Sequence, residues 1–188
     1  MKALMPGPRK RTKASRKHKP SRLAQLERAL RKKDPLGELN LLVNDKLEPG
    51  KTFAFAYACI LETNSATLAI LFDRFTRSQL DRTEKVLQKI GAIDTLADFR
   101  ALRGPFDQSV AKGKPPNVAS AALDEREELR AIARKYNAHT SEMEECLLAF
   151  AKSHVNELAA AKPTLTPETA RFIRDALAQG EKAVRSRR

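Results

Sequence analysis

The chain contains no tryptophan, only two tyrosines and only two cysteines among its 188 residues. Because aromatic residues are scarce while the hydrophobic share is 41%, a core of Leu, Ala and Ile side chains in packed helices is favoured over a β-sandwich or a β-barrel. We therefore expect an all-α fold, a compact bundle of about eight short helices. The length suits one domain with a tail.

The two cysteines, Cys59 and Cys146, lie on separate apolar stretches and form no CxxC motif. This arrangement predicts reduced, buried thiols rather than a disulfide framework or a metal site. The longest apolar run, residues 53–61, is about half the length of a membrane span, and the N-terminus lacks the apolar stretch of a signal peptide. We expect a cytoplasmic protein, or a nucleoid protein if it binds DNA, with no membrane span.

Positive charge is concentrated at the two ends of the chain. The net charge is +13, and residues 1–33 hold thirteen Lys or Arg against one Glu, a net charge of +12. Residues 181–188 carry +3, which leaves −2 for residues 34–180. Any binding of a polyanion must therefore involve the ends of the chain.

The cations of the N-terminal segment are the candidate binding residues. Side chains that neutralise phosphates release condensed counterions, so they bind the DNA or RNA backbone with steep salt dependence and without reading bases. No aromatic residue precedes Phe53, which excludes base stacking on this segment. Two alternatives stay open: a solvated tail without a ligand, and an anionic membrane surface into which only three leucines could insert. The predicted nucleic-acid-binding residues are Arg9, Lys10, Arg11, Lys13, Arg16, Lys17, Lys19, Arg22, Arg28, Arg31, Lys32 and Lys33.

Composition divides the chain into three segments. Residues 1–20 combine three prolines with dense like charge and almost no apolar residues, which predicts a disordered basic arm. A helical domain is expected over residues 21–180, followed by a basic C-terminal tail at residues 181–188. Ser21 is a good N-cap for a short basic helix whose leucines at 23, 26 and 30 share one face.

Apolar spacing and capping residues predict the remaining helices. Residues 53–59 alternate as a strand would, yet three alanines favour a helix, which we prefer because no second clear strand exists to pair with it. Residues 104–117 are expected to form a loop. The other expected helices run from Asp34 to Pro49, Asn64 to Phe72, Ser78 to Gly91, Asp94 to Leu102, Ala122 to Tyr136, Met143 to Leu158 and Thr166 to Gly180.

Two His-x-x-Glu pairs, His139 with Glu142 and His154 with Glu157, could suggest a metal site. A carboxylate-bridged site needs ligands that converge from facing helices, whereas these pairs lie about four helical turns apart. They cannot share a metal within one chain, so we interpret both histidines as core or boundary residues.

Two helices joined by a turn at Gly91 could suggest a helix-turn-helix. The second helix offers only Arg100 and Arg103 beside two aspartates, so core packing is the better interpretation. The acidic residues at 124, 125, 127 and 128 open a helix, where the helix dipole favours them. No P-loop, GxSxG or HExxH motif is present, so we expect a non-enzymatic protein without cofactor or metal, with an active site lacking a named motif as the alternative.

One further sequence pattern spans the middle and the end of the chain. It consists of Val86-Leu87, Ile90-Gly91-Ala92, Thr95, Ala97 and Phe99, and of the run LLAFAKSHVNEL from Leu147 to Leu158. This pattern resembles a family of small helical bacterial domains of largely unknown function, named after a member described as a DNA mimic. The family's paired glycine and aromatic residue are replaced here by Ser65-Ala66 and Thr67.

The resemblance covers roughly the central two-thirds of the chain and implies a helical fold with a role in binding rather than catalysis. DNA mimicry needs a strongly negative surface, which a charge of −2 over residues 34–180 does not provide. We therefore expect a helical domain that contacts the DNA or RNA backbone through its basic N-terminal arm. The alternative is a protein-interaction or regulatory module with an incidental basic tail.

Overall fold

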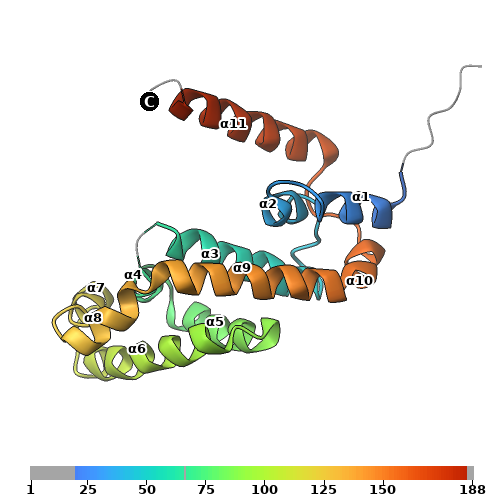
Figure 1. Ribbon diagram of the computed structural model, residues 1–188. Coiled ribbons are helices and arrows are strands. Elements are labelled where there is room, and N and C mark those ends of the chain that lie inside the picture. The colour runs from blue at the N-terminus through green and yellow to red at the C-terminus, as the bar shows by residue number, and fades with distance from the viewer. Residues whose placement is uncertain (1–19, 66, 186–188) are drawn as a thin grey trace, which may run out of the picture.

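The computed structural model describes residues 20–65 and 67–185, with side chains as far as Ala176. Over this range the protein is all-helical, with eleven helices and no strand, which confirms the expected fold class (Figure 1). The expected arm lies outside the described residues except for Pro20. The helices are α1 (Arg22–Ala29), α2 (Pro35–Asn40), α3 (Gly50–Thr63), α4 (Ile70–Arg74), α5 (Arg77–Ile90), α6 (Ile93–Ala111), α7 (Pro116–Ala121), α8 (Glu127–Arg134), α9 (Tyr136–Ser153), α10 (Val155–Ala160) and α11 (Pro167–Arg185).

Helix α3 lies at the centre of the bundle. Phe53, Ala56, Cys59 and Ile60 are almost fully buried along it, and α2, α4, α5 and α9 pack around it. The ambiguous segment at residues 53–59 is therefore a helix, as we favoured. Its alanines allow neighbouring helices to approach closely, and each buried Phe or Ile contributes about 1.5–3 kcal/mol.

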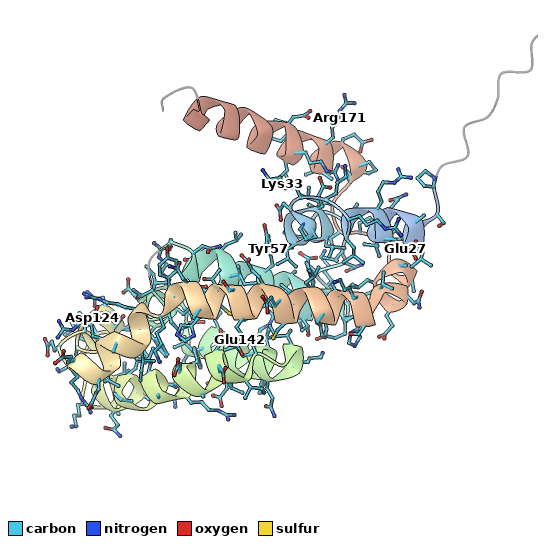
Figure 2. All side chains as sticks on the ribbon, in the orientation of Figure 1. Glu27, Lys33, Tyr57, Asp124, Glu142 and Arg171 are labelled. Carbon is cyan, nitrogen blue, oxygen red and sulfur yellow. The ribbon has the colours of Figure 1, made fainter. Side chains whose placement is uncertain are left out.

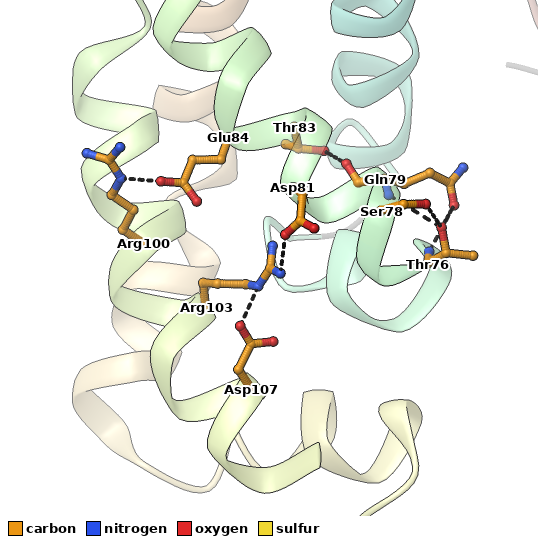
Figure 3. A network of polar contacts seen from close by, with 9 residues as sticks. All are labelled: Thr76, Ser78, Gln79, Asp81, Thr83, Glu84, Arg100, Arg103 and Asp107. Carbon is orange, nitrogen blue, oxygen red and sulfur yellow. Dashed lines mark hydrogen bonds and ion pairs between the residues drawn. The ribbon is translucent and has the colours of Figure 1, made fainter. Parts of the chain in front are cut away.

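Helix α5 shows the expected inner face, with Leu80, Thr83, Leu87 and Ile90 all buried. Gly91 ends it with a left-handed φ of 82°, a conformation that glycine adopts without steric cost. The start differs from the prediction, because Thr76 rather than Ser78 is the N-cap. Thr76 and Gln79 form a capping box, in which each side chain bonds to the other residue's backbone N–H (Figure 3).

Helix α6 does not end at Gly104-Pro105 as predicted. It continues to Ala111, so most of the expected loop at 104–117 is helical, and α7 begins at Pro116. Proline removes the hydrogen bond to the carbonyl four residues earlier, here that of Ala101. Ala101 is exposed, so water can satisfy that carbonyl, while Phe106 beyond the proline is buried and holds the helix to the core.

The helix expected from Ala122 begins only at Glu127, because residues 122–126 form a turn between α7 and α8. The helix expected from Met143 to Leu158 is divided by a bend at His154 between α9 and α10. At this bend the N–H of His154 and the hydroxyl of Ser153 both donate to the carbonyl of Phe150. The bend turns the buried Leu158 and the rest of α10 toward α1, which a straight α9 could not reach.

Other helix boundaries also differ from those expected. Helix α2 ends at Asn40 rather than at Pro49, Asn64 ends α3 instead of starting a helix, and α4 begins only at Ile70. Helix α11 begins after Thr166 as predicted, because the hydroxyl of that residue accepts from the N–H of Thr169. It passes Gly180 and reaches Arg185, so the helix includes part of the segment expected to be a tail.

Gly50 provides a direct test of the packing around α3. A Cβ at this position would lie 2.2 Å from the carbonyl oxygen of Asn44, whereas one at Gly104 would meet nothing within 4 Å. We expect Gly50→Ala to lower the free energy of unfolding by about 1–3 kcal/mol through this overlap. Gly104→Ala should lower it by less, because no atom beyond the chain neighbours of residue 104 lies within 4 Å of the added Cβ and only the following Pro105 restricts it. Urea denaturation followed by circular dichroism measures the free energy of unfolding of both variants. Equal effects of the two substitutions would contradict the close contact between Gly50 and Asn44.

Candidate nucleic-acid interface

Helix α1 anchors the basic N-terminal segment to the fold. The hydroxyl of Ser21 accepts from the N–H of Ala24, as expected of an N-cap, and Leu26 and Ala29 are buried against α10 and α2. Leu30 also packs against the core. The apolar face of α1 is therefore turned inward, so its polar face is turned toward solvent.

The structure describes five of the twelve predicted binding residues. Four of them, Arg28, Arg31, Lys32 and Lys33, are exposed, and none forms a salt bridge with a residue that the structure describes. They lie on α1 and in the turn that joins it to α2. Four cations therefore remain available on one short stretch of a firmly packed element. The other seven predicted residues lie outside the described part: Arg9, Lys10, Arg11, Lys13, Arg16, Lys17 and Lys19.

Arg22 lies in a different environment from these four residues. It is partly buried, and burial lowers the pKa of its guanidinium. Its Nε and Nη2 atoms are buried and find no hydrogen-bond partner among the described residues. The structure therefore separates Arg22 from the exposed cations with which the sequence grouped it.

Helix α11 lies on the same side of the body as α1 and α2 (Figure 1). The Nε of Arg174 donates to the Oε2 of Glu38 on α2 at 3.0 Å. A groove of about 290 Å³ lies between the three helices, and Arg28, Lys32, Glu38 and Arg174 are among the residues that line it. Sequence reasoning did not find Arg174, because 136 residues separate it from Glu38.

The connection before α11 holds that helix in place. The Nδ2 of Asn44 donates to the carbonyl of Lys162 at 2.7 Å. The hydroxyl of Thr164 donates to the Oδ1 of Asp45 at 2.5 Å and accepts from its N–H at 3.1 Å. These bonds join the loop after α2 to the loop before α11, so α11 begins at a defined position beside α2.

The two arginines of the possible recognition helix are engaged within the bundle. Arg100 donates to Glu84 at 2.7 Å, and the buried Arg103 donates to Asp81 at 2.7 Å and to Asp107 at 2.8 Å (Figure 3). Burial acts to lower the pKa of Arg103, but the bonds with Asp107 and Asp81 outweigh it and raise that pKa. Both cations join α6 to its neighbours, in agreement with the core-packing interpretation.

The histidine and glutamate pairs serve the fold in a similar way. His139 is buried, with its Nε2 3.3 Å from the carbonyl oxygen of Ile132 and 3.4 Å from Asp98. Glu142 accepts from the N–H groups of Asp94 and Thr95, at 2.9 and 2.6 Å, and so caps α6 from a helix far away in the sequence. Within the described part of the chain, no three His, Cys, Asp or Glu side chains are placed to hold a metal ion.

His154 is a boundary residue, and the acidic cluster lies away from the basic groove. The His154 ring stacks on Phe150, with centroids 4.3 Å apart, as a boundary histidine would. Figure 2 places Asp124 and Glu27 at opposite ends of the molecule, so the acidic start of α8 is remote from α1. Glu127 and Glu128 lie in the first turn of α8, where the prediction put them, whereas Asp124 and Glu125 lie in the turn before the helix.

Neither cysteine forms a disulfide, in agreement with the sequence. Cys59 is buried, and this burial raises its pKa to about 12. Cys146 is only partly buried, contrary to the expectation of two buried thiols. The pKa of its thiol is raised mainly by desolvation and also by the negative charges of Glu142 and Glu145.

A comparison with protein-family models, curated proteins and solved structures finds no match for this chain. No helix among the described residues is long and apolar enough to cross a membrane.

The ion pairs of α6 predict unequal effects of two similar substitutions. Arg103→Ala removes a buried side chain that joins two carboxylates, and should lower the free energy of unfolding by about 2 kcal/mol. Arg100→Ala breaks an exposed pair, which is worth about 0–1 kcal/mol. Thermal and urea denaturation compare the two variants. A larger loss for Arg100→Ala would show that Arg103 does not hold α5 and α6 together.

The thiols should differ in reactivity toward Ellman's reagent. At pH 8 a thiol with a pKa of about 12 has a thiolate fraction of about 10⁻⁴, and burial also blocks access to it. We expect one fast-reacting thiol per native chain and two after denaturation. Cys146→Ser should abolish the fast native reaction, while Cys59→Ser should preserve it. Rapid native labelling of Cys59 would contradict its placement.

Proposed function

We propose that this protein is a non-enzymatic helical domain that binds the backbone of DNA or RNA through its basic N-terminal segment, largely without regard to sequence. The observation that carries the proposal is the exposure of Arg28, Arg31, Lys32 and Lys33 on and beside a packed helix, with no salt bridge to a described residue. Nine further Lys or Arg residues precede them in the sequence.

The chemistry of these side chains favours phosphates as the ligand. Guanidinium and ammonium groups form charge-assisted hydrogen bonds with phosphate oxygens and release counterions from the nucleic acid. The first 52 residues contain no aromatic side chain on which a base could stack. Recognition of the backbone, with weak discrimination between sequences, follows from this composition.

The division of charge supports the same function. Residues 34–180 carry only −2, so the body neither repels a polyanion strongly nor imitates one. A packed α1 presents its cations from a fixed position, so less side-chain and backbone entropy is lost on binding than with a free tail alone. We also propose that the resemblance to the family of small helical bacterial domains reflects a shared binding role, without DNA mimicry.

A protein-binding role is the second candidate, and a groove of about 440 Å³ between α2, α3 and α9 favours it. Leu61 on its rim is 53% exposed, and Leu148 lies beside it. Burial, with Asp34 and Glu144 nearby, raises the pKa of the Tyr57 hydroxyl in this groove. This candidate requires residues 34–180 to bind a partner without help from the basic segment.

Binding of a labelled DNA duplex and a labelled RNA hairpin, followed by fluorescence anisotropy between 50 and 200 mM salt, tests the first candidate. Replacing Arg28, Arg31, Lys32 and Lys33 together by alanine should weaken binding to both probes. It should also reduce the slope of log K against log salt by about 0.9 for each lost phosphate contact with a duplex.

The matched control replaces four exposed cations elsewhere, Lys112, Lys114, Arg134 and Lys135, and changes the net charge by the same amount. This control should retain most of the affinity and the slope. Equal losses in both variants would show that total charge, rather than the α1 surface, governs binding. If the unaltered chain shows no salt-dependent binding, nucleic acid is rejected as the ligand.

A further inference from the structure

The groove between α1, α2 and α11 brings cations from the two ends of the chain together. Arg28 near the end of α1 and Lys32 in the turn after that helix both line one side of the groove. Arg174 lines the opposite side from α11. Three cations therefore face a single carboxylate, that of Glu38, inside one concave surface.

We propose that this groove binds a phosphate group of the nucleic-acid backbone, and that α11 is therefore part of the binding surface. The inference rests on the proposed function and extends it from the N-terminal segment to the C-terminal helix. Its ligand is a backbone phosphodiester, held by Arg28 and Lys32 on one side and by Arg174 on the other.

The orientation of Arg174 suits this role. Glu38 occupies only the Nε edge of its guanidinium, at 3.0 Å, and no hydrogen bond to a described residue engages the two terminal nitrogens. The side chain remains 37% exposed, so a ligand in the groove can reach it. A guanidinium fixed by one carboxylate can direct its remaining N–H groups at a phosphate, as a preorganised donor.

The position of α11 is also fixed near Arg174. The bonds from Asn44 to Lys162 and between Asp45 and Thr164 hold the start of the helix, and Ala170 is buried one turn before Arg174. Arg171, in contrast, is 84% exposed, does not line the groove, and lies on the outer side of α11 (Figure 2). The two arginines share a helix and a charge and differ in where they point.

The test compares three full-length variants with the unaltered chain, using the labelled duplex and anisotropy over a range of salt concentrations. Arg174→Gln should weaken binding by about three- to tenfold and reduce the salt slope by about one. Arg171→Gln removes the same charge outside the groove and should change binding by less than about twofold. Glu38→Gln removes the negative charge that faces the cations but keeps a side-chain oxygen that can accept from the Nε of Arg174, so it should tighten binding.

Each outcome bears on the proposal. Equal losses of affinity for Arg174→Gln and Arg171→Gln would overturn the proposed phosphate site. Weaker binding by Glu38→Gln, with its helix content and melting temperature unchanged, would overturn it as well. If Glu38→Gln lowers the melting temperature, Arg174→Lys decides, because it keeps the charge and should bind more tightly than Arg174→Gln. Normal binding by Arg174→Gln, together with loss in the quadruple α1 variant, would reject this site and leave the proposed function standing. Failure of the unaltered chain to bind would reject both.

Discussion

The burial of α3 is the constraint on which the other helices depend. Its apolar residues face several directions, so a single neighbour cannot cover them, and α2, α4, α5 and α9 close around it. Helix α9 in turn leads to α10, which supports α1, while α2 contacts α1 and is joined to α11. The position of each basic helix therefore follows from the packing of an apolar one.

The division of charge has a structural explanation as well as a compositional one. Many carboxylates of the body are engaged locally: Glu142 caps α6, Asp81 and Asp107 hold Arg103, and Glu62 pairs with Arg74 at 2.5 Å. These carboxylates satisfy backbone donors or internal cations. None of these carboxylates pairs with Arg28, Arg31, Lys32 or Lys33, which are exposed.

Local sequence signals predicted several helix ends correctly. Ser21, Asp34 and Thr166 are N-caps, and Gly91 is a C-terminal stop, because each acts through backbone groups a few residues away. The failures have a different origin. Pro105 is expected to end α6, but the helix continues because the turn before the proline is exposed to water and Phe106 after it is buried in the core. Neither the exposure nor the burial can be read from the local sequence.

The sequence by itself determined the helical class and the location of positive charge, because helical periodicity and net charge are properties of neighbouring residues. It also indicated that the helix holding Arg100 and Arg103 packs against the core rather than reading a groove of DNA. Only the tertiary structure decided that Arg174 lies across a groove from Arg28 and Lys32, and that Arg22 is set apart from them. Those relations depend on how helices far apart in the chain pack together, and no local pattern encodes such a distance.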